Sequence, residues 1–263
     1  MKVRSLDKVD LAVMLGSGLG RVSDAYHATT DVSFEEIPGV TRPEVVGHRG
    51  GLKRCAIGRR ACLFVEGRRH HYEGKARELY HLIAFVKSRG VDKLLLTSAA
   101  GSIDPALPPG QLVLIEQIVD LQHRSPASGV SEPRPAAVAA RPEVAGPRLE
   151  LDGVMNDMLR RSAAVAGISL ATATMATCSG PAYETPAEVR ALQQTGASVV
   201  SMSGAPEIAA ANSLGIQVAS VALITNWATS ISDARPSHAN VLEAGRRATD
   251  LLTRLIAQFA RFV

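Results

Sequence analysis

The sequence has few cysteines and few aromatic residues, and each scarcity excludes a class of protein. Its three cysteines, Cys55, Cys62 and Cys178, form no CxxC pair, which argues against a disulfide framework or structural zinc and indicates a reducing, cytoplasmic location. Only 4% of the residues are aromatic, whereas nucleic-acid-binding proteins usually cluster aromatic and basic residues together. No apolar run approaches the roughly 20 residues that cross a bilayer, and no signal-peptide cleavage site follows the start. We therefore expect neither nucleic acid nor a membrane as a partner.

The composition is that of a globular protein. Hydrophobic residues make up 46% and charged residues 21% of 263 positions, close to average usage. The formal net charge is +4, a mild positive balance that suits a small anionic substrate.

Short apolar runs alternate with amphipathic stretches along the chain. Strands are predicted at 11–15, 52–57, 61–66, 93–97, 112–118, 171–177, 198–202 and 217–225. One helix is predicted to end at Gly90, and another is predicted from about 239 to 262. A further helix is predicted after Thr185, with Pro186 in its first turn and with Thr185 and Glu188 forming a capping box. This alternation predicts an α/β fold, a single domain over 1–263 whose central mixed β-sheet is flanked by helices.

One segment interrupts the pattern. Residues 123–148 hold five of the fourteen prolines and predict a long surface excursion, which is either a lid or a linker.

Two motifs after predicted strands could bind an anion. Gly16–Gly20 (GSGLG) offers backbone N–H groups and the Ser17 hydroxyl, but it matches neither a dinucleotide fingerprint nor a Walker loop, so a purely structural turn stays open. In GRRHHYE, Arg68 can bind phosphate through two N–H bonds and His70 can add a donor. The alternative interpretation of this motif, a basic loop exposed to solvent without a ligand, is not excluded by the sequence. Adjacent histidines in an extended segment point to opposite sides, which argues against a metal.

Three further motifs offer polar groups at predicted strand and helix ends. Glu184 precedes a helix, where it either interacts with the helix dipole or accepts from a ligand, and Tyr183 offers a flat face. Ser203 precedes another helix and can donate to an anion there. Asn226 ends a strand and offers both a donor and an acceptor. No GxSxG or HExxH motif occurs, and this combination suits a reaction whose nucleophile is a bound phosphate.

The motifs GSGLG, VVGH, EGRRHHYEG, TSAAGS, GPAYET, SMSGAPE and LITN occur in this order between residues 16 and 226. In this order they resemble the trimeric purine nucleoside phosphorylases, related to the methylthioadenosine phosphorylases. The resemblance implies a homotrimer that converts a purine nucleoside and phosphate to a free purine and ribose 1-phosphate, with no cofactor and no metal.

The resemblance also implies roles for individual residues. The phosphate site would consist of Ser17, His48, Arg68, His70, the N–H of Ala99, and Ser203. The nucleoside site would consist of Tyr72, Met202 and His238 at the sugar, and Tyr183, Glu184, Val200 and Asn226 at the base. His70, Glu184 and Asn226 would be the catalytic residues.

Two of these residues bear on the substrate. Asn226 can donate to a 6-carbonyl, whereas the methylthioadenosine phosphorylases carry Asp nearby, and His238 suits a free sugar hydroxyl. Both favour inosine or guanosine. The alternatives are a phosphorylase for methylthioadenosine or methylthioinosine and a non-catalytic purine-binding paralogue. The sequence contains no DxDxxxDD run, which argues against a calcium-dependent nucleoside hydrolase.

The chain departs from the family pattern at several positions. Ser98 replaces the usual Asn, Ser102 and Ser201 each replace a Gly, and Gly204 replaces a Thr. The excursion at 123–148 also lacks the segments from which the family builds a lid.

Overall fold

The computed structural model describes residues 6, 8–74, 76–122 and 148–263. Most of the predicted excursion, 123–147, lies outside them. Its last position, Arg148, opens a short strand.

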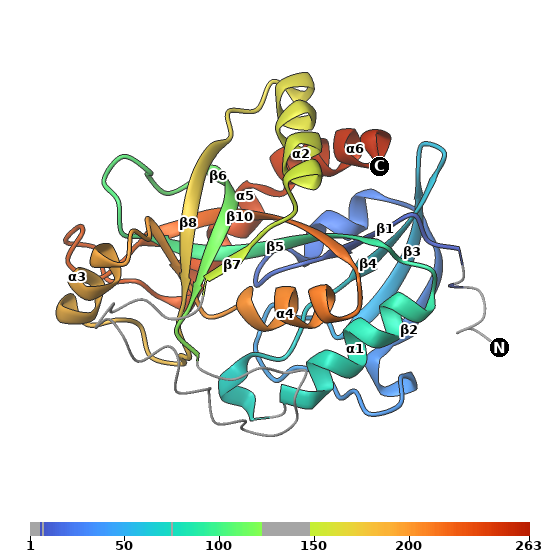
Figure 1. Cartoon of the computed structure of the whole chain (residues 1–263), viewed down its shortest axis with the longest axis horizontal. Coiled ribbons are helices and arrows are strands. Elements are labelled where there is room, and N and C mark those ends of the chain that lie inside the picture. The colour runs from blue at the N-terminus through green and yellow to red at the C-terminus, as the bar shows by residue number, and fades with distance from the viewer. Residues whose placement is uncertain (1–5, 7, 75, 123–147) are drawn as a thin grey trace, which may run out of the picture.

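Within the described residues, ten strands pair in one mixed sheet. Following the pairing, the strand order is β10 (Gln217–Trp227), β6 (Leu112–Asp120), β8 (Ala171–Thr177), β9 (Val199–Ser201), β5 (Lys93–Ser102), β1 (Leu11–Met14), β4 (Arg60–Val65), β3 (Gly51–Ile57) and β2 (Ala28–Ser33), with β7 (Arg148–Glu150) beside β6. Because β10 also pairs with β5, the first five strands close into a ring, and the other four extend from it (Figure 1). The predicted mixed sheet is confirmed.

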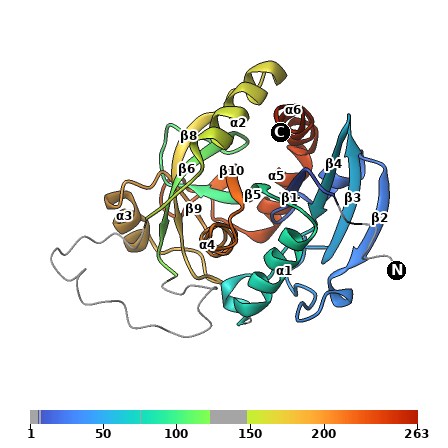
Figure 2. The same cartoon turned by 45° about the vertical axis from the view of Figure 1, so that its right-hand side comes forward.

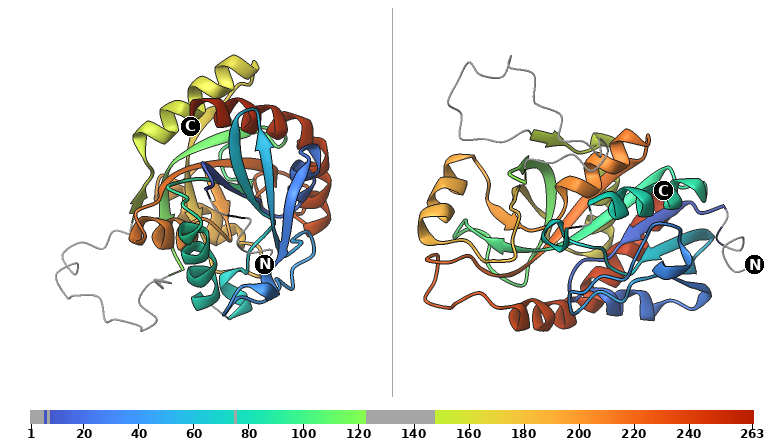
Figure 3. Two further views of the ribbon diagram at one scale, coloured as in Figure 1. Left: turned by 90° about the vertical axis from the view of Figure 1, so that its right-hand side faces the viewer. Right: turned by 90° about the horizontal axis from the view of Figure 1, so that it is seen from below.

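Six α-helices in the described part of the chain cover the sheet. They are α1 (Ala76–Ser88), α2 (Gly153–Ala166), α3 (Pro186–Gln194), α4 (Ala205–Ser213), α5 (His238–Arg247) and α6 (Thr249–Phe262). Helix α1 packs beside α4, and α2 packs beside α6 (Figures 1 and 2). Figure 3 shows the strands lying between α1 on one side and α6 on the other.

Strand alternation divides the core between these two layers. In β1, Ala12 and Met14 face the cluster that contains α1 and α4, whereas Leu11 and Val13 face the cluster that contains α2 and α6. Successive side chains of a strand point to opposite faces. The continuous apolar runs seen in the sequence therefore belong to strands buried on both sides.

The helix termini follow the sequence signals. The Thr185 hydroxyl accepts from the Glu188 N–H, and the Glu188 carboxylate accepts from the Thr185 N–H at 2.7 Å, so the predicted capping box is confirmed. The single helix predicted over 239–262 is wrong, because the helix breaks at Ala248 into α5 and α6. The Ala248 N–H there contacts the carbonyls of both Ala244 and Arg246.

The topology gathers chain segments at one edge. Strand β1 runs parallel to β4 and β5, β5 runs parallel to β10, and β8 runs parallel to β9. The carboxyl ends of parallel strands are where α/β sheets bind ligands. The predicted motifs follow these ends. No helix in the described residues has the length and hydropathy that spanning a membrane requires.

Helix α6 tests the core assignment. Phe259 is fully buried against the sheet, while Phe262 on the same helix is 38% exposed. We expect Phe259→Ala to lower the free energy of unfolding by about 3–5 kcal/mol, because truncation leaves a cavity. Phe262→Ala is the control and should cost below about 1 kcal/mol. Urea denaturation measures both, and equal losses would contradict this packing.

Candidate active site

A cavity of about 270 Å³ opens where the strand ends meet. It is lined by Ser17, Val45, His70, Tyr72, Ala99, Ala100, Gly101, Pro181, Tyr183, Glu184, Val200, Ser201, Met202, Ser203, Thr225, Asn226, Ala228, His238 and Val241. Eleven of the thirteen predicted site residues are among them. The other two, His48 and Arg68, are not in the lining and lie behind it.

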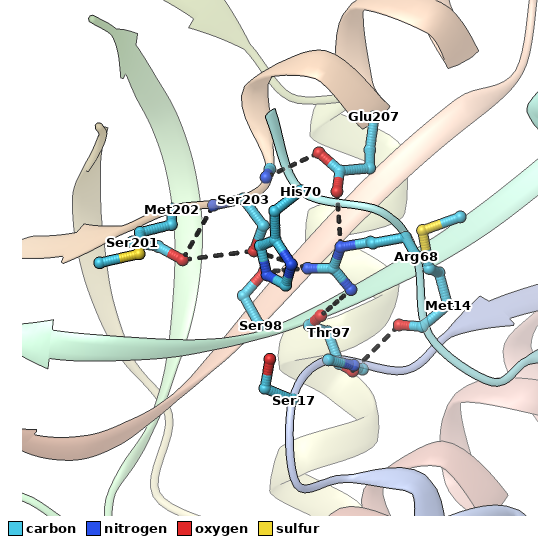
Figure 4. A network of polar contacts seen from close by, with 12 residues as sticks. Met14, Ser17, Arg68, His70, Thr97, Ser98, Ser201, Met202, Ser203 and Glu207 are labelled. Carbon is cyan, nitrogen blue, oxygen red and sulfur yellow. Dashed lines mark hydrogen bonds and ion pairs between the residues drawn. The ribbon is translucent and has the colours of Figure 1, made fainter. Parts of the chain in front are cut away.

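Arg68 is buried and points its guanidinium toward five protein groups (Figure 4). Its Nη1 donates to the carbonyls of Leu15 and Thr97, at 3.3 and 3.2 Å. Its Nη2 donates to the hydroxyls of Ser203 and Ser98, at 2.7 and 3.3 Å. Since Ser203 lines the cavity, Arg68 contacts the lining through that hydroxyl.

The positive charge of Arg68 is balanced by Glu207 of α4. The Glu207 Oε1 lies 2.5 Å from the Arg68 Nε, and both side chains are at most 2% exposed. The other carboxylate oxygen accepts from the Gly204 N–H at 2.8 Å, in the first turn of α4. Removing one partner of such a buried pair costs about 3–5 kcal/mol. The pair therefore fixes the start of α4, and with it Ser203, against β4.

His48 orients Ser17. The Arg68 N–H donates to the His48 Nδ1 at 3.2 Å, so the proton of the neutral ring is on Nε2. That nitrogen then donates to the Ser17 Oγ at 2.9 Å, which leaves the Ser17 proton free to donate into the cavity. Burial, together with the charges of His70, Arg68 and His238, holds the pKa of His48 well below 6.5. His48 is therefore neutral at pH 7.

His70 is held between a carboxylate and two rings. Glu73 accepts from the His70 N–H at 2.6 Å, and its carboxylate lies 3.5 Å from the ring Nδ1. Burial raises the pKa of Glu73, but hydrogen bonds from His70 and from the Glu44 and His70 backbone outweigh it and bring the pKa to about 2. The ring stacks on Tyr72 and meets His48 edge-on. Glu73 is therefore ionised, and its negative charge favours a proton on the His70 Nδ1 that faces it.

Asn226 and Glu184 lie in the same cavity as these groups. The Asn226 Oδ1 accepts from the Thr225 hydroxyl at 2.7 Å, and its Nδ2 donates to the Trp227 carbonyl at 2.9 Å. One N–H and one lone pair of the amide remain for a ligand. Burial, with the nearby Glu188, raises the pKa of Glu184.

His238 joins the cavity to the loop before β3. It is the first residue of α5, and its Nε2 donates to the Val46 carbonyl at 2.8 Å. The Nδ1 of the neutral ring is then an acceptor, as a ligand hydroxyl requires.

Comparisons with known proteins agree with this geometry. Residues 10–261 match the family model of the phosphorylase superfamily. The purine nucleoside phosphorylase of Mycobacterium tuberculosis is 37% identical over 256 residues, which cover 96% of this chain and 90% of that protein. The chain belongs to the purine nucleoside phosphorylases.

More distant members match over most of the chain. The Bos taurus enzyme is 30% identical over 94% of this chain and 86% of its own length. A crystal structure of Schistosoma mansoni purine nucleoside phosphorylase with adenosine has a TM-score of 0.79 and 27% identity, over 95% of this chain and 90% of that one. The predicted family, fold and enzyme class are confirmed.

The departures from the purine nucleoside phosphorylase pattern have local structural counterparts. Ser98 accepts from Arg68, and the Ser102 hydroxyl donates to the Asp104 carbonyl at 2.8 Å in the turn after β5. Gly204 has a φ of 120°, a backbone conformation that residues with a side chain rarely adopt, so a threonine would be strained here. The chain lacks the hydroxyl at 204 and has one in the cavity at Ser201, which donates to the Ala99 carbonyl at 2.9 Å.

Sequence reasoning missed several lining residues, among them Val45, Pro181, Thr225 and Val241. All are near predicted site residues or follow from them: Val45 is in the VVGH motif, and Thr225 precedes Asn226. Val241 is one helical turn after His238, a spacing that would have placed it on the same helix face. No group of three or more His, Cys, Asp or Glu side chains in the described residues is placed to hold a metal ion.

The neutral state of His48 predicts how stability depends on pH. An unfolded histidine titrates near 6.5, whereas the folded His48 titrates well below it. Below pH 6.5 the unfolded state therefore binds a proton that the folded state does not, and the free energy of unfolding falls. Between pH 7.5 and 5.5, the chain should lose about 1 kcal/mol more than His48→Gln. Urea denaturation at both pH values measures this, and equal losses would contradict a ring that stays neutral in the folded chain.

Proposed function

We propose that this chain catalyses phosphorolysis of purine nucleosides of the inosine and guanosine type. A phosphate oxygen bonds to the sugar C1′ as the glycosidic bond breaks, and the bonding electron pair leaves with the purine. The products are the free purine and ribose 1-phosphate. The observation that carries the proposal is a single cavity with hydroxyl and imidazole donors at one end and the Asn226 amide and Glu184 at the other.

The phosphate end is supported by converging donors. Ser17 and His70 line the cavity beside Ser203, which stands at the N-terminus of α4. A helix N-terminus favours an anion, and the Arg68 charge lies directly behind Ser203. We assign phosphate to Ser17, His70, Ser203 and the Ala99 N–H, with His48 and Arg68 supporting the serines.

The nucleophile is the bound phosphate. Ser17 and His48 are within hydrogen-bonding distance, as a serine nucleophile and its base would be. However, a base must accept the serine proton, and the His48 Nε2 already carries one because Nδ1 accepts from the Arg68 N–H. This tautomer argues against hydrolysis through an activated Ser17.

The base end stabilises the departing purine. Negative charge develops on the purine as the bond breaks, and a preorganised amide donor can stabilise it. Asn226 has one N–H free for a 6-carbonyl and one lone pair free for a ring N–H. Glu184 accepts from the other edge of the base, Tyr183 and Val200 contact its face, and Tyr72, Met202 and His238 contact the sugar.

The proposal also covers the assembly, location and domain extent that the family resemblance implies. The chain would assemble as a homotrimer in the cytoplasm and use phosphate as its co-substrate without a cofactor. The domain would extend over 1–263, with 123–148 as the excursion. The runner-up substrate is a methylthio-nucleoside, which would share the phosphate end and differ at the base and sugar.

The first test is a substrate panel. Base release from inosine, guanosine, adenosine and methylthioadenosine should be followed with and without phosphate. We expect release from inosine or guanosine that requires phosphate. Release from methylthioadenosine alone would refute the base assignment and leave the phosphate end standing, and release without phosphate would refute phosphorolysis.

Asn226→Asp tests the base assignment. A carboxylate accepts but does not donate, so it should repel a 6-carbonyl and accept from a 6-amino group. We expect the ratio of kcat/KM for inosine over adenosine to fall by at least about tenfold, since an unpaired polar contact costs about 1–3 kcal/mol. Asn212→Asp, at an exposed position in the last turn of α4 and outside the cavity lining, is the control. An unchanged ratio would mean that Asn226 does not contact the 6-position.

A further inference from the structure

Glu66 is a nearly buried carboxylate for which the proposed reaction has no use. It follows β4 directly, opens the EGRRHHYEG motif and is 8% exposed. It is not among the residues that line the cavity. Acidic side chains are rarely buried unless paired, so its contacts indicate what it does.

The Glu66 side chain contacts three elements. The hydroxyl of the fully buried Ser23, in the 3-10 helix Gly20–Ala25, donates to Oε1. Arg49 donates to the same oxygen at 3.3 Å. The Lys53 ammonium of β3 lies 3.6 Å from it. Because these contacts converge on one carboxylate, Glu66 joins the segment after β1 to the segment before β3.

The Glu66 backbone holds the second of these segments. Its carbonyl accepts from the N–H groups of Arg49 and Gly50, both at 2.9 Å, and its own N–H donates to the Gly51 carbonyl at 2.8 Å. The position of residues 49–51 is therefore set from Glu66 by both main chain and side chain.

The two segments carry Ser17 and His48. Ser17 precedes the Gly20–Ala25 turn, and the Ser23 hydroxyl also lies 2.8 Å from the Gly20 carbonyl. His48 immediately precedes Arg49, and its ring contacts Gly67 so closely that a Cβ there would lie 2.4 Å from it. The 2.9 Å bond between Ser17 and His48 therefore spans the segments that Glu66 joins.

We propose that Glu66 is a positioning residue for the phosphate end of the cavity. It holds the Gly20–Ala25 turn against residues 48–51 at the separation at which His48 can donate to Ser17. This inference rests on the proposed phosphorolysis. Glu66 does not contact phosphate and acts only through Ser17 and His48.

The charges explain why a carboxylate fits here. Arg49 and Lys53 face Glu66 and Asp24, two cations against two anions. The Asp24 side chain is 48% exposed, whereas that of Glu66 is 10% exposed. Burial strengthens a hydrogen-bonded pair and leaves it little screened by salt. Asp24 makes the shorter contacts with Arg49, two hydrogen bonds of 2.6 Å at the exposed rim, whereas Glu66 is the buried anion and alone also accepts from Ser23.

The test is steady-state kinetics of Glu66→Ala and Glu66→Gln with inosine and phosphate varied separately. We expect Glu66→Ala to raise the KM for phosphate about tenfold, the lower end of the effect of losing a supporting partner at metal sites. The KM for inosine should change less than about twofold, because Asn226 and Glu184 lie on other segments. Glu66→Gln keeps the acceptor for Ser23 and should recover most of the loss.

Glu116→Gln is the matched control, since Glu116 of β6 pairs with Arg160 of α2 away from the cavity. Its two KM values should stay unchanged. If Glu66→Ala does not fold, Ser23→Ala, which removes the other partner, should also raise the KM for phosphate alone.

The outcomes separate this inference from the proposed function. Phosphate-dependent turnover of the unaltered chain with an unchanged phosphate KM in the Glu66 and Ser23 variants overturns the role of Glu66 and leaves the function standing. Equal rises in both KM values also overturn it, because they indicate a general loss of structure. No phosphate-dependent turnover by the unaltered chain overturns both.

Discussion

The buried guanidinium of Arg68 is the interaction on which the carboxyl edge of the sheet depends. It contacts the end of β1 at Leu15, β5 at Thr97 and Ser98, and the start of α4 at Ser203 and Glu207. A charge removed from water costs several kcal/mol unless its geometry and hydrogen bonds are nearly complete. Any displacement of these segments would leave a donor unpaired, so the cation requires them to meet in one arrangement.

This arrangement places the charge of Arg68 behind the residues that line the cavity. Arg68 donates to Ser203, and the neutral His48 donates to Ser17. Each serine oxygen is thereby held as an acceptor from the protein, and its proton is directed elsewhere. An anion in the cavity would meet oriented hydroxyls that need not reorganise, which is how enzymes stabilise charge most effectively.

The sequence predicted the parts of the molecule that obey local rules. The buried strands, the Thr185 capping box and the order of the motifs required only neighbouring residues. The break at Ala248 was not predictable in this way, because no proline marks it, the nearest glycine, Gly245, lies within α5, and the apolar periodicity continues from Val241 to Phe259. Strand β2 was also missed, since its sequence ATTDVS is mostly polar and only Val32 is buried.

The same limit applies to the site. Residue types identified the donors and the amide, but not which of them face the cavity. Arg68 was expected to bind phosphate with two N–H bonds, and its placement behind Ser203 depends on Glu207, which lies 139 positions later in the chain. The exchange of hydroxyls between positions 201 and 204 likewise depends on the backbone at Gly204, whose φ of 120° favours glycine and cannot be read from the sequence.

The central claim is that phosphate is the nucleophile in this cavity, and the identity of the sugar product tests it most directly. ³¹P NMR of inosine incubated with the protein and phosphate should show one new sugar phosphate resonance growing in step with hypoxanthine release. Stoichiometric hypoxanthine with free ribose and no new phosphorus signal would mean that water attacks the sugar, and would contradict the account.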